Sequence, residues 1–245
     1  MNILGLSLGI LSTAALFKNC ELKSCISQER FSRLKNDESF PIDAINFVLN
    51  ENSLQGKDLD AVIIAGNMLN LNTHSMRKYS KWSLKDHYDL QNLYWKPKLL
   101  ENKNLSFNEL FKDKIDVDQY PGQAAWRELF NNISDEYEDR NNETVYKNFL
   151  HKIISDFLDI SSEKIIHLDH HECHASYAYW STQIRGKDSL IVTADAFGAG
   201  LSSTISCINE KGNISRVHSV NANDFQLGRL YRSITLLLSM MPDAH

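Results

Sequence analysis

Four histidines fall within eight consecutive positions, in a chain that has nine histidines among 245 residues. They are His167, His170, His171 and His174. The apolar run before them predicts a buried strand, and Asp169 is suited to cap a following helix, because its carboxylate accepts hydrogen bonds from first-turn amides. On that helix, His170 and His174 lie on one face, one turn apart. Two imidazoles placed in this way can bind one metal ion, although the same spacing also occurs on ordinary helix surfaces.

A carboxylate follows at the end of the next predicted strand, Leu190–Ala194, and two glycines come directly after it. In a strand–helix–strand unit with parallel strands, the end of the second strand returns to the start of the helix. Asp195 is therefore expected beside the histidine pair, as a third metal ligand. Gly198 and Gly200 allow the backbone to approach a phosphate closely, so we predict that they bind phosphate.

Three protein ligands leave open positions on a divalent cation, and phosphate oxygens can fill those positions. Nitrogen and oxygen donors suit iron, manganese and zinc alike, so the ligand set does not choose among these metals. The other two histidines have different interpretations. His171 points away from the pair, as a helix-surface residue, a residue supporting the pair, or a contact to an acceptor. His167, on the strand, is interpreted as a core histidine.

The elements that must position these residues form a repeated pattern. Apolar alternation predicts strands at 3–7, 14–17 and 22–27, joined by turns rich in small residues. After Asp195 a Gly-bearing turn leads to strands at 203–208 and 214–220. This internal duplication predicts an α/β protein of the actin/hexokinase-like (ribonuclease H-like) duplicated fold, in which two hairpin turns hold phosphates from opposite sides.

The predicted domain organisation follows from this repeat. Residues 1–66 and 149–185 form the first actin-like half, and residues 186–245 begin a second half that is incomplete. Residues 67–148 are rich in Asn, Lys and aromatic side chains, with helical spacing at 107–111 and 124–130, and are predicted to be a helical insertion. Its aromatic side chains either pack a small helical layer or line an acceptor pocket.

Composition excludes several classes of protein. The net charge of -5 argues against a nucleic-acid groove, which needs a basic balance. No signal-peptide pattern opens the chain, and the longest apolar run, 234–241, is too short to span a membrane. Four scattered cysteines without a zinc-type spacing indicate reduced thiols and a cytoplasmic location.

Two cations follow the first predicted meander, Arg30 and Lys35. A guanidinium and an ammonium at that place are suited to contact phosphate, so both are candidate nucleotide-binding residues. The alternative interpretation is an ordinary solvated face, because charged side chains are mostly exposed.

Several of these pieces together resemble the N-terminal part of NodU-type O-carbamoyltransferases, relatives of the HypF and TsaD proteins. The matching pieces, in the family's order, are Ile3–Ser7, Gln28–Arg33 with Lys35, Phe40-Pro41, Asp169-His170-His171 with His174-Ala175, Asp195 with its glycine turn, and Gly228–Tyr231. The resemblance implies that His170, His174 and Asp195 bind a metal ion that touches nucleotide phosphates. It also implies that a YrdC-like domain, in the same or another chain, makes carbamoyl-adenylate from carbamoyl phosphate and ATP. The carbamoyl group then passes to the hydroxyl of a small-molecule acceptor.

The chain departs from the family pattern in two places. Ile10-Leu11 occupies the position of a His-Asp pair in the first hairpin turn, and aliphatic side chains cannot act as a base. The sequence also stops at His245, where relatives continue, so we expect either a fragment or one chain of a split enzyme. Apolar residues near that end (Leu230, Ile234, Leu237 and Leu238) would then be bare, which predicts self-association or a covering partner.

Two other functions stay open at this point. One is a nucleotide-binding phosphotransferase of the same fold, which would need a catalytic carboxylate that the first hairpin does not supply. The other is a catalytically inactive regulatory or scaffold subunit, which the aliphatic pair Ile10-Leu11 favours.

Overall fold

The computed structural model describes residues 1–8, 11–37, 40–66, 83–111, 140–183, 188–222, 224 and 227–241. Contacts divide the chain into two compact units. The first unit consists of Met1–Met68 and Lys147–Ala222, and the second of Leu69–Tyr146 and Asn223–His245. The domain boundaries expected from the sequence group the chain differently, and they stay a prediction.

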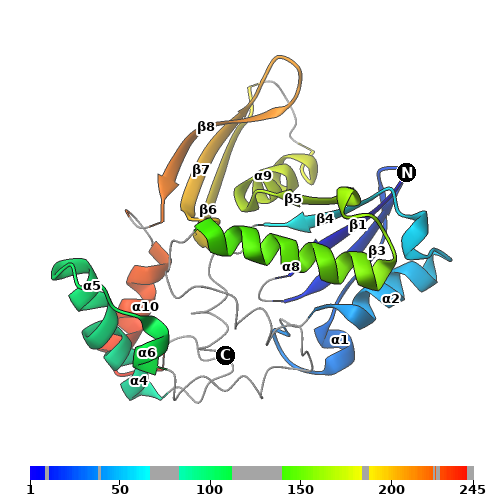
Figure 1. The fold of residues 1–245 in the computed structure, drawn as a ribbon. Coiled ribbons are helices and arrows are strands. Elements are labelled where there is room, and N and C mark those ends of the chain that lie inside the picture. Colours follow the sequence, from blue (N-terminus) through cyan, green and yellow to red (C-terminus); the bar gives the residue numbers. More distant parts are fainter. Residues whose placement is uncertain are drawn as a thin grey trace. The chain divides into compact units, whose positions relative to one another are not determined.

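The first unit contains a five-stranded mixed sheet in the order β3-β2-β1-β4-β5 (Figure 1). Its strands are β1 (Asn2–Ser7), β2 (Thr13–Lys18), β3 (Glu21–Ser27), β4 (Ala61–Ala65) and β5 (Ile165–Leu168). The first three strands form the predicted antiparallel meander, while β4 pairs parallel with both β1 and β5. The carboxyl ends of β1, β4 and β5 therefore meet at one edge of this sheet.

Helix α2 (Ile42–Glu51) buries one apolar stripe, Ala44, Ile45, Val48 and Leu49. Its first turn is held by a side chain from another element: Gln28 accepts a hydrogen bond from the Ala44 amide at 3.1 Å and donates one to Asp43 at 2.8 Å. The short elements α1 (Glu29–Ser32), η1 (Gly56–Asp58) and η5 (Ser162–Lys164) lie between the larger ones. Helix α8 (Arg140–Leu158) contacts the β5 edge, where His151 stacks on His167 with ring centroids 5.2 Å apart.

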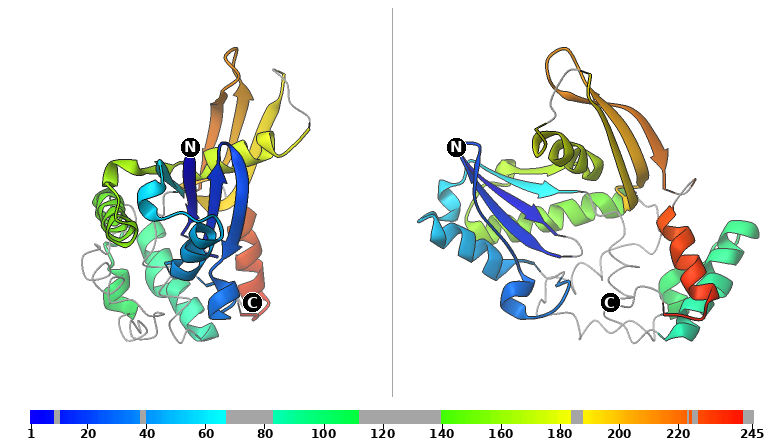
Figure 2. Two further views of the ribbon diagram at one scale, coloured as in Figure 1. Left: turned by 90° about the vertical axis from the view of Figure 1, so that its right-hand side faces the viewer. Right: turned by 180° about the vertical axis from the view of Figure 1, so that it is seen from behind.

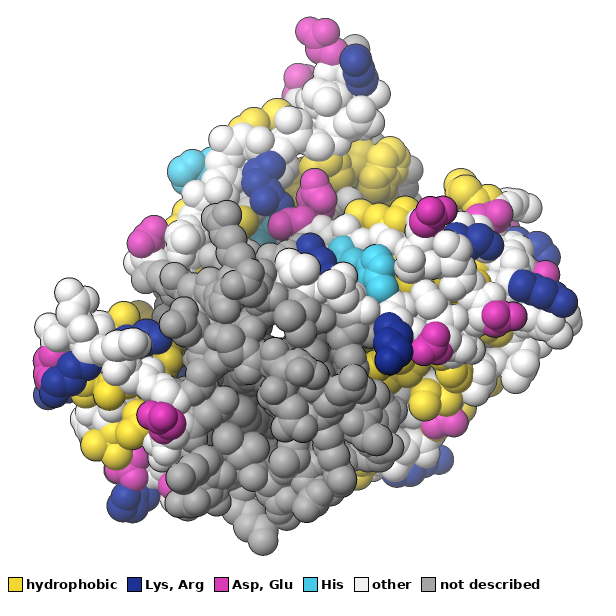
Figure 3. Space-filling view, in the orientation of Figure 1, with side chains coloured by type: hydrophobic (Ala, Val, Ile, Leu, Met, Phe, Trp, Pro, Cys, Tyr) yellow, Lys and Arg dark blue, Asp and Glu magenta, His cyan; other side chains and the backbone are white. Residues whose placement is uncertain are grey.

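A second, three-stranded antiparallel sheet follows in the same unit, with strands β6 (Leu190–Gly198), β7 (Leu201–Ile208) and β8 (Ile214–Asn221). Helix α9 (His170–Trp180) packs on one face of it through Ala175 and Tyr179, and Figure 2 shows the same arrangement from behind. Hydrophobic side chains also reach the surface near this sheet (Figure 3), and Leu190 is 67% exposed.

The expectation that Leu190–Ala194 is a parallel neighbour in the first sheet is wrong. Within the described residues β6 pairs only with β7, in a sheet of its own. A tight two-residue turn at Ala199 and Gly200 joins β6 to β7, so the backbone of β6 pairs with the next strand of the chain and not with β5. The mixed α/β class and the repeat of a three-stranded antiparallel meander are confirmed.

The second unit is helical over its described residues. It contains α4 (Leu84–Asp89), η2 (Leu90–Trp95), α5 (Lys96–Leu100), α6 (Phe107–Phe111) and α10 (Leu227–Leu237). Leu90, Tyr94 and Phe111 form its apolar cluster, and the Tyr88 hydroxyl donates to the Leu236 carbonyl at 2.7 Å. The helix expected at 124–130 lies outside the described residues. None of the described helices is both long and apolar enough to cross a membrane.

A candidate metal centre between a helix and a hairpin

The three predicted ligand residues converge. The Nε2 atoms of His170 and His174 are 2.9 Å apart, and Asp195 Oδ2 lies 2.5 Å from the first and 3.7 Å from the second. All three candidate ligand atoms lie within 4.8 Å of one another. Ligands about 2.1 Å from a common metal ion would be about 3.0–3.4 Å apart, close to this spacing. The site is open to ligands, because the His174 side chain is 52% exposed.

The donor set fits a cation. If the His170 Nε2 carries a proton and donates it to Asp195, it has no lone pair left to accept a hydrogen bond from His174. A metal ion resolves this conflict, since it accepts a lone pair from each imidazole and from the carboxylate at once. The residues present are therefore suited to hold a divalent metal.

Two glycines make room for the His170 ring. A Cβ added at Gly198 would lie 2.2 Å from His170 Cδ2, and one added at Gly66 would lie 3.2 Å from His170 Nδ1. Gly66 follows β4, while Gly198 ends β6, so the imidazole lies between the edge of one sheet and the hairpin of the other. Gly198 thus has a role in seating His170, beside the phosphate contact predicted for it, which stays a prediction.

The turn after Asp195 has the backbone of a tight hairpin. Ala199 and Gly200 both have positive φ, 52° and 82°, between the paired residues Gly198 and Leu201. Two successive positive φ values are typical of a type I′ turn, in which glycine is favoured at no steric cost. The turn conformation alone therefore explains why a glycine occupies position 200, and the contact of Gly200 with phosphate also stays a prediction.

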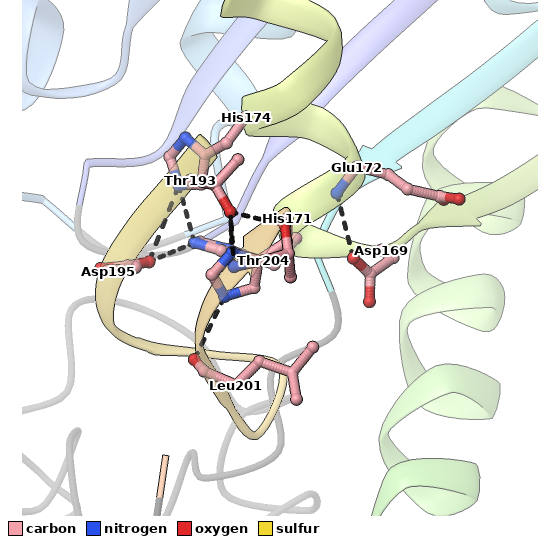
Figure 4. A network of polar contacts seen from close by, with 9 residues as sticks. Asp169, His171, Glu172, His174, Thr193, Asp195, Leu201 and Thr204 are labelled. Carbon is pink, nitrogen blue, oxygen red and sulfur yellow. Dashed lines mark hydrogen bonds and ion pairs between the residues drawn. The ribbon is translucent and has the colours of Figure 1, made fainter. Parts of the chain in front are cut away.

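His171 is buried completely, so the interpretation of it as a surface or acceptor-contacting residue is wrong. Its Nδ1 lies 2.7 Å from Thr193 Oγ1 and its Nε2 lies 3.1 Å from the Leu201 carbonyl oxygen (Figure 4). Burial lowers the pKa of this imidazole and favours the neutral ring. The helix periodicity correctly predicted that His171 points away from His170 and His174. It could not predict that strands of the second sheet cover His171, because periodicity within one helix does not show what packs against it.

The N-terminus of α9 is fixed as the sequence predicted. The Asp169 side chain accepts a hydrogen bond from the Glu172 amide at 3.0 Å, and it also pairs with Arg216 of β8. Burial pulls the pKa of Asp169 upward, but the Glu172 amide and the Arg216 guanidinium outweigh it and hold the pKa below its ordinary value. The carboxylate is thus charged where it caps the helix and ties it to the second sheet.

The predicted phosphate-binding cations are not joined to this centre by any described ion pair or hydrogen bond. Arg30 is 70% exposed and pairs with its neighbour Glu29 at 3.3 Å, and Lys35 is exposed. Their contact with a nucleotide stays a prediction. Leu11, in the first hairpin, is exposed with φ 128°, a backbone region that Leu rarely adopts. Ile10 lies outside the described residues.

Comparisons with known proteins agree with the motif pattern. A family model described as "Carbamoyltransferase N-terminus" matches residues 2–245. The uncharacterized protein sll1178 of Synechocystis sp. is 38% identical over 52 residues, which make up 21% of this chain and 8% of that relative. The match thus spans only a small part of the relative's length. Among solved structures, YeaZ from Pseudomonas aeruginosa is similar with a TM-score of 0.36 at 7% identity, over 90% of this chain and 68% of that one.

Proposed function

The chain belongs to the carbamoyltransferase N-terminus family, and from this premise we propose that it is the metal- and nucleotide-binding part of an O-carbamoyltransferase. It holds a divalent cation with His170, His174 and Asp195 and presents carbamoyl-adenylate to the hydroxyl of a small-molecule acceptor. The observation that supports this most directly is the convergence of the three ligand atoms within 4.8 Å. When bound, the cation supplies charge neutralisation for phosphate oxygens.

The proposed transfer is a substitution at a carbonyl carbon. The acceptor oxygen forms a bond to the carbamoyl carbon, the bond from that carbon to the phosphate oxygen of carbamoyl-adenylate breaks, and AMP leaves. The hydroxyl proton must pass to a base. His170, His174 and Asp195 would hold the cation, which would neutralise charge on the leaving phosphate, while Arg30, Lys35, Gly198 and Gly200 are the proposed phosphate contacts. Carbamoyl-adenylate itself would come from a YrdC-like domain in the same or another chain.

The metal-binding step is tested by elemental analysis of the purified protein after loading with iron, manganese or zinc. The wild type is expected to retain about one divalent ion per chain, as a three-ligand site predicts, and His174→Ala is expected to retain none. His218→Ala is the matched control, because His218 is an exposed histidine of the same unit on β8, outside the centre. Equal metal content in the wild type and His174→Ala would refute the site.

The transfer step is tested by incubating the metal-loaded protein with carbamoyl-adenylate and a panel of alcohols, sugars among them. A carbamoylated alcohol detected by mass spectrometry supports the proposal. Release of AMP without a carbamoylated product would indicate hydrolysis instead. Phosphorylation of a sugar by ATP, in the absence of carbamoyl phosphate, would favour a phosphotransferase.

A catalytically inactive regulatory or scaffold subunit is the second candidate. Leu11 favours it, because an aliphatic side chain in the first hairpin cannot accept the hydroxyl proton. Metal and nucleotide binding without any carbamoyl transfer, even with the panel of acceptors, is the result expected for such a subunit.

We also propose that the apolar residues of α10 are covered by a partner or by a second copy of the chain. Leu230 is 59% exposed and Leu237 is 79% exposed, with Tyr231, Ile234 and Leu238 also exposed beside them. Soluble monomers avoid contiguous apolar patches beyond a few hundred Å². Light scattering during size-exclusion chromatography should find dimers or larger species, and Leu230→Glu with Leu237→Glu should reduce them. A monodisperse wild-type monomer at high concentration would contradict this.

A further inference from the structure

The candidate metal centre is assembled from a helix and a strand, and no backbone hydrogen-bond ladder sets the position of one relative to the other. His170 and His174 belong to α9, whereas Asp195 belongs to β6 of the second sheet. Metal sites tolerate errors of about 0.2 Å in ligand distance. A slip of β6 by one residue would move Asp195 by about 3.3 Å and turn it to the opposite face. A directional interaction, such as a hydrogen bond, must therefore fix the position of α9 along β6.

Apolar packing between these elements is present, but it is not directional. Ala175 and Tyr179 of α9 contact Ile191 and Ile208 of the second sheet. These contacts lie further along the helix than His170 and tolerate small displacements, because hydrophobic attraction depends on buried area and not on orientation. They hold the helix on the sheet without setting its register.

A buried hydrogen-bond chain has the required direction. The Leu201 carbonyl oxygen only accepts, so the His171 Nε2 carries the proton and the Nδ1 accepts one from Thr193 Oγ1, 2.7 Å away. Thr193 Oγ1 in turn accepts from the Thr204 hydroxyl at 2.7 Å and from the Thr204 amide at 3.2 Å. Each donor thus has one acceptor, and the chain runs from β7 through β6 to α9 and back to the hairpin (Figure 4).

We propose that His171 and Thr193 are positioning residues of the metal centre, which lock α9 to the β6–β7 hairpin so that the three ligands meet. The placement of the pair in the chain supports this. His171 is the residue after one ligand, His170, and Thr193 is two residues before another, Asp195, on the same strand. The Leu201 carbonyl belongs to the residue that closes the turn after Gly198. One imidazole therefore holds the helix, the ligand strand and the glycine turn together. The inference rests on the proposed metal centre.

The test uses Thr193→Val, which keeps the shape of the side chain and removes the hydroxyl. Thr193→Ser keeps the hydroxyl and is the rescue variant. Ser206→Ala is the matched control, because Ser206 is a buried hydroxyl residue two positions after Thr204 in β7. Binding of Mn²⁺ and Co²⁺ to the metal-free 245-residue protein is measured by titration calorimetry, well below the melting temperature of each variant.

Thr193→Val is expected to bind metal about 10–100-fold more weakly, as is usual when the groups that orient metal ligands are removed. Thr193→Ser and Ser206→Ala are expected to bind as the wild type does. A folded Thr193→Val with wild-type affinity would overturn the proposal and show that the hydroxyl only stabilises the fold. If Thr193→Val does not fold, Thr193→Ala removes the same hydroxyl and is judged by the same outcomes.

A measurement without metal separates this inference from the proposed function. In ¹H–¹⁵N spectra of the histidine rings, wild-type His171 should be the neutral ring protonated at Nε2. Thr193→Val should shift the signals of His170 and His174, and Ser206→Ala should not. If the wild type binds no metal, the metal part of the proposed function fails. The positioning role then stands if those shifts are seen and is overturned if both rings are unchanged.

Discussion

The two meanders share a plan of strands but carry different chemistry. Strands β1–β3 and β6–β8 are each antiparallel, and aligning Gly9–Leu16 with Gly200–Cys207 in the sequence makes Thr13 the counterpart of Thr204. Thr13 Oγ1 donates to the Leu11 carbonyl and contacts Ser27 Oγ, which are both local to its own meander. Thr204 Oγ1 instead bonds Thr193 and, through it, the buried His171 of another element. The same residue type thus closes a local turn in one meander and connects elements in the other.

The elements packed around the two meanders explain why Thr13 and Thr204 have different contacts. Strand β1 pairs on its other side with β4, so the first meander is anchored in a five-stranded sheet. Within the described residues the second meander has only three strands, and α9 takes up one of its faces. A helix bearing imidazoles beside a strand that carries Asp195 creates a ligand set that is not found in the described residues of the first meander. Duplication therefore supplied a scaffold, and the elements packed against each copy decided its chemistry.

The largest effect is expected from giving the first hairpin the residues that the family has there. We predict that Ile10→His combined with Leu11→Asp raises carbamoyl transfer by about 100–10,000-fold, the range that a positioned general base contributes. Leu11 has φ 128°, which side chains with a Cβ rarely adopt, so exchanging Leu for Asp there adds no new backbone strain. Product formation is followed by mass spectrometry, with Leu11→Asp alone as the control. No gain in the double variant would show that the first hairpin is not what limits transfer.

A smaller effect, a loss of metal affinity, is expected from filling the space beside His170. We predict that Gly198→Ala weakens metal binding about 100-fold, because the new Cβ would lie 2.2 Å from His170 Cδ2 and push the ring away from Asp195. Gly5→Ala is the counterpart in the first meander, where the new Cβ would have its nearest contact at 3.7 Å. Metal affinity of both variants is measured by calorimetry. Similar affinities for the two variants would contradict the seating role of Gly198.

The smallest effect concerns the tie between α9 and β8. We predict that Asp169→Ala lowers the free energy of unfolding by about 1 kcal/mol at neutral pH, because the helix loses its N-cap. Asp169→Asn is the control, since Asn also caps but cannot form the ion pair with Arg216. The folded-state pKa of Asp169 lies below its ordinary 3.8, so its contribution is present above that pH and is lost as the pH falls through the folded pKa. Urea unfolding at several pH values should show the unfolding free energies of the wild type and Asp169→Ala converging in acid. A difference between them that stays constant with pH would refute this.

Much of the local structure was predictable from the residues alone. The meanders, the capped helix starting after Asp169 and the repeat all follow from alternation, turn residues and capping chemistry, which act over a few positions. The identity of the metal-ligand candidates was also predictable, since the spacing of His170 and His174 already puts them on one helix face.

The partners of these elements were decided by the tertiary structure. Strand alternation specifies an extended segment but not its neighbour, so the sequence placed Asp195 beside the histidines for the wrong reason, through a parallel sheet that β6 does not join. It likewise could not show that Gly198 seats His170 or that Thr193 and Thr204 complete a chain with a buried His171. Those contacts join residues 11 to 30 positions apart, on three different elements. Their geometry depends on how a helix and a separate sheet pack together, and that packing is set by the whole core and not by any local pattern.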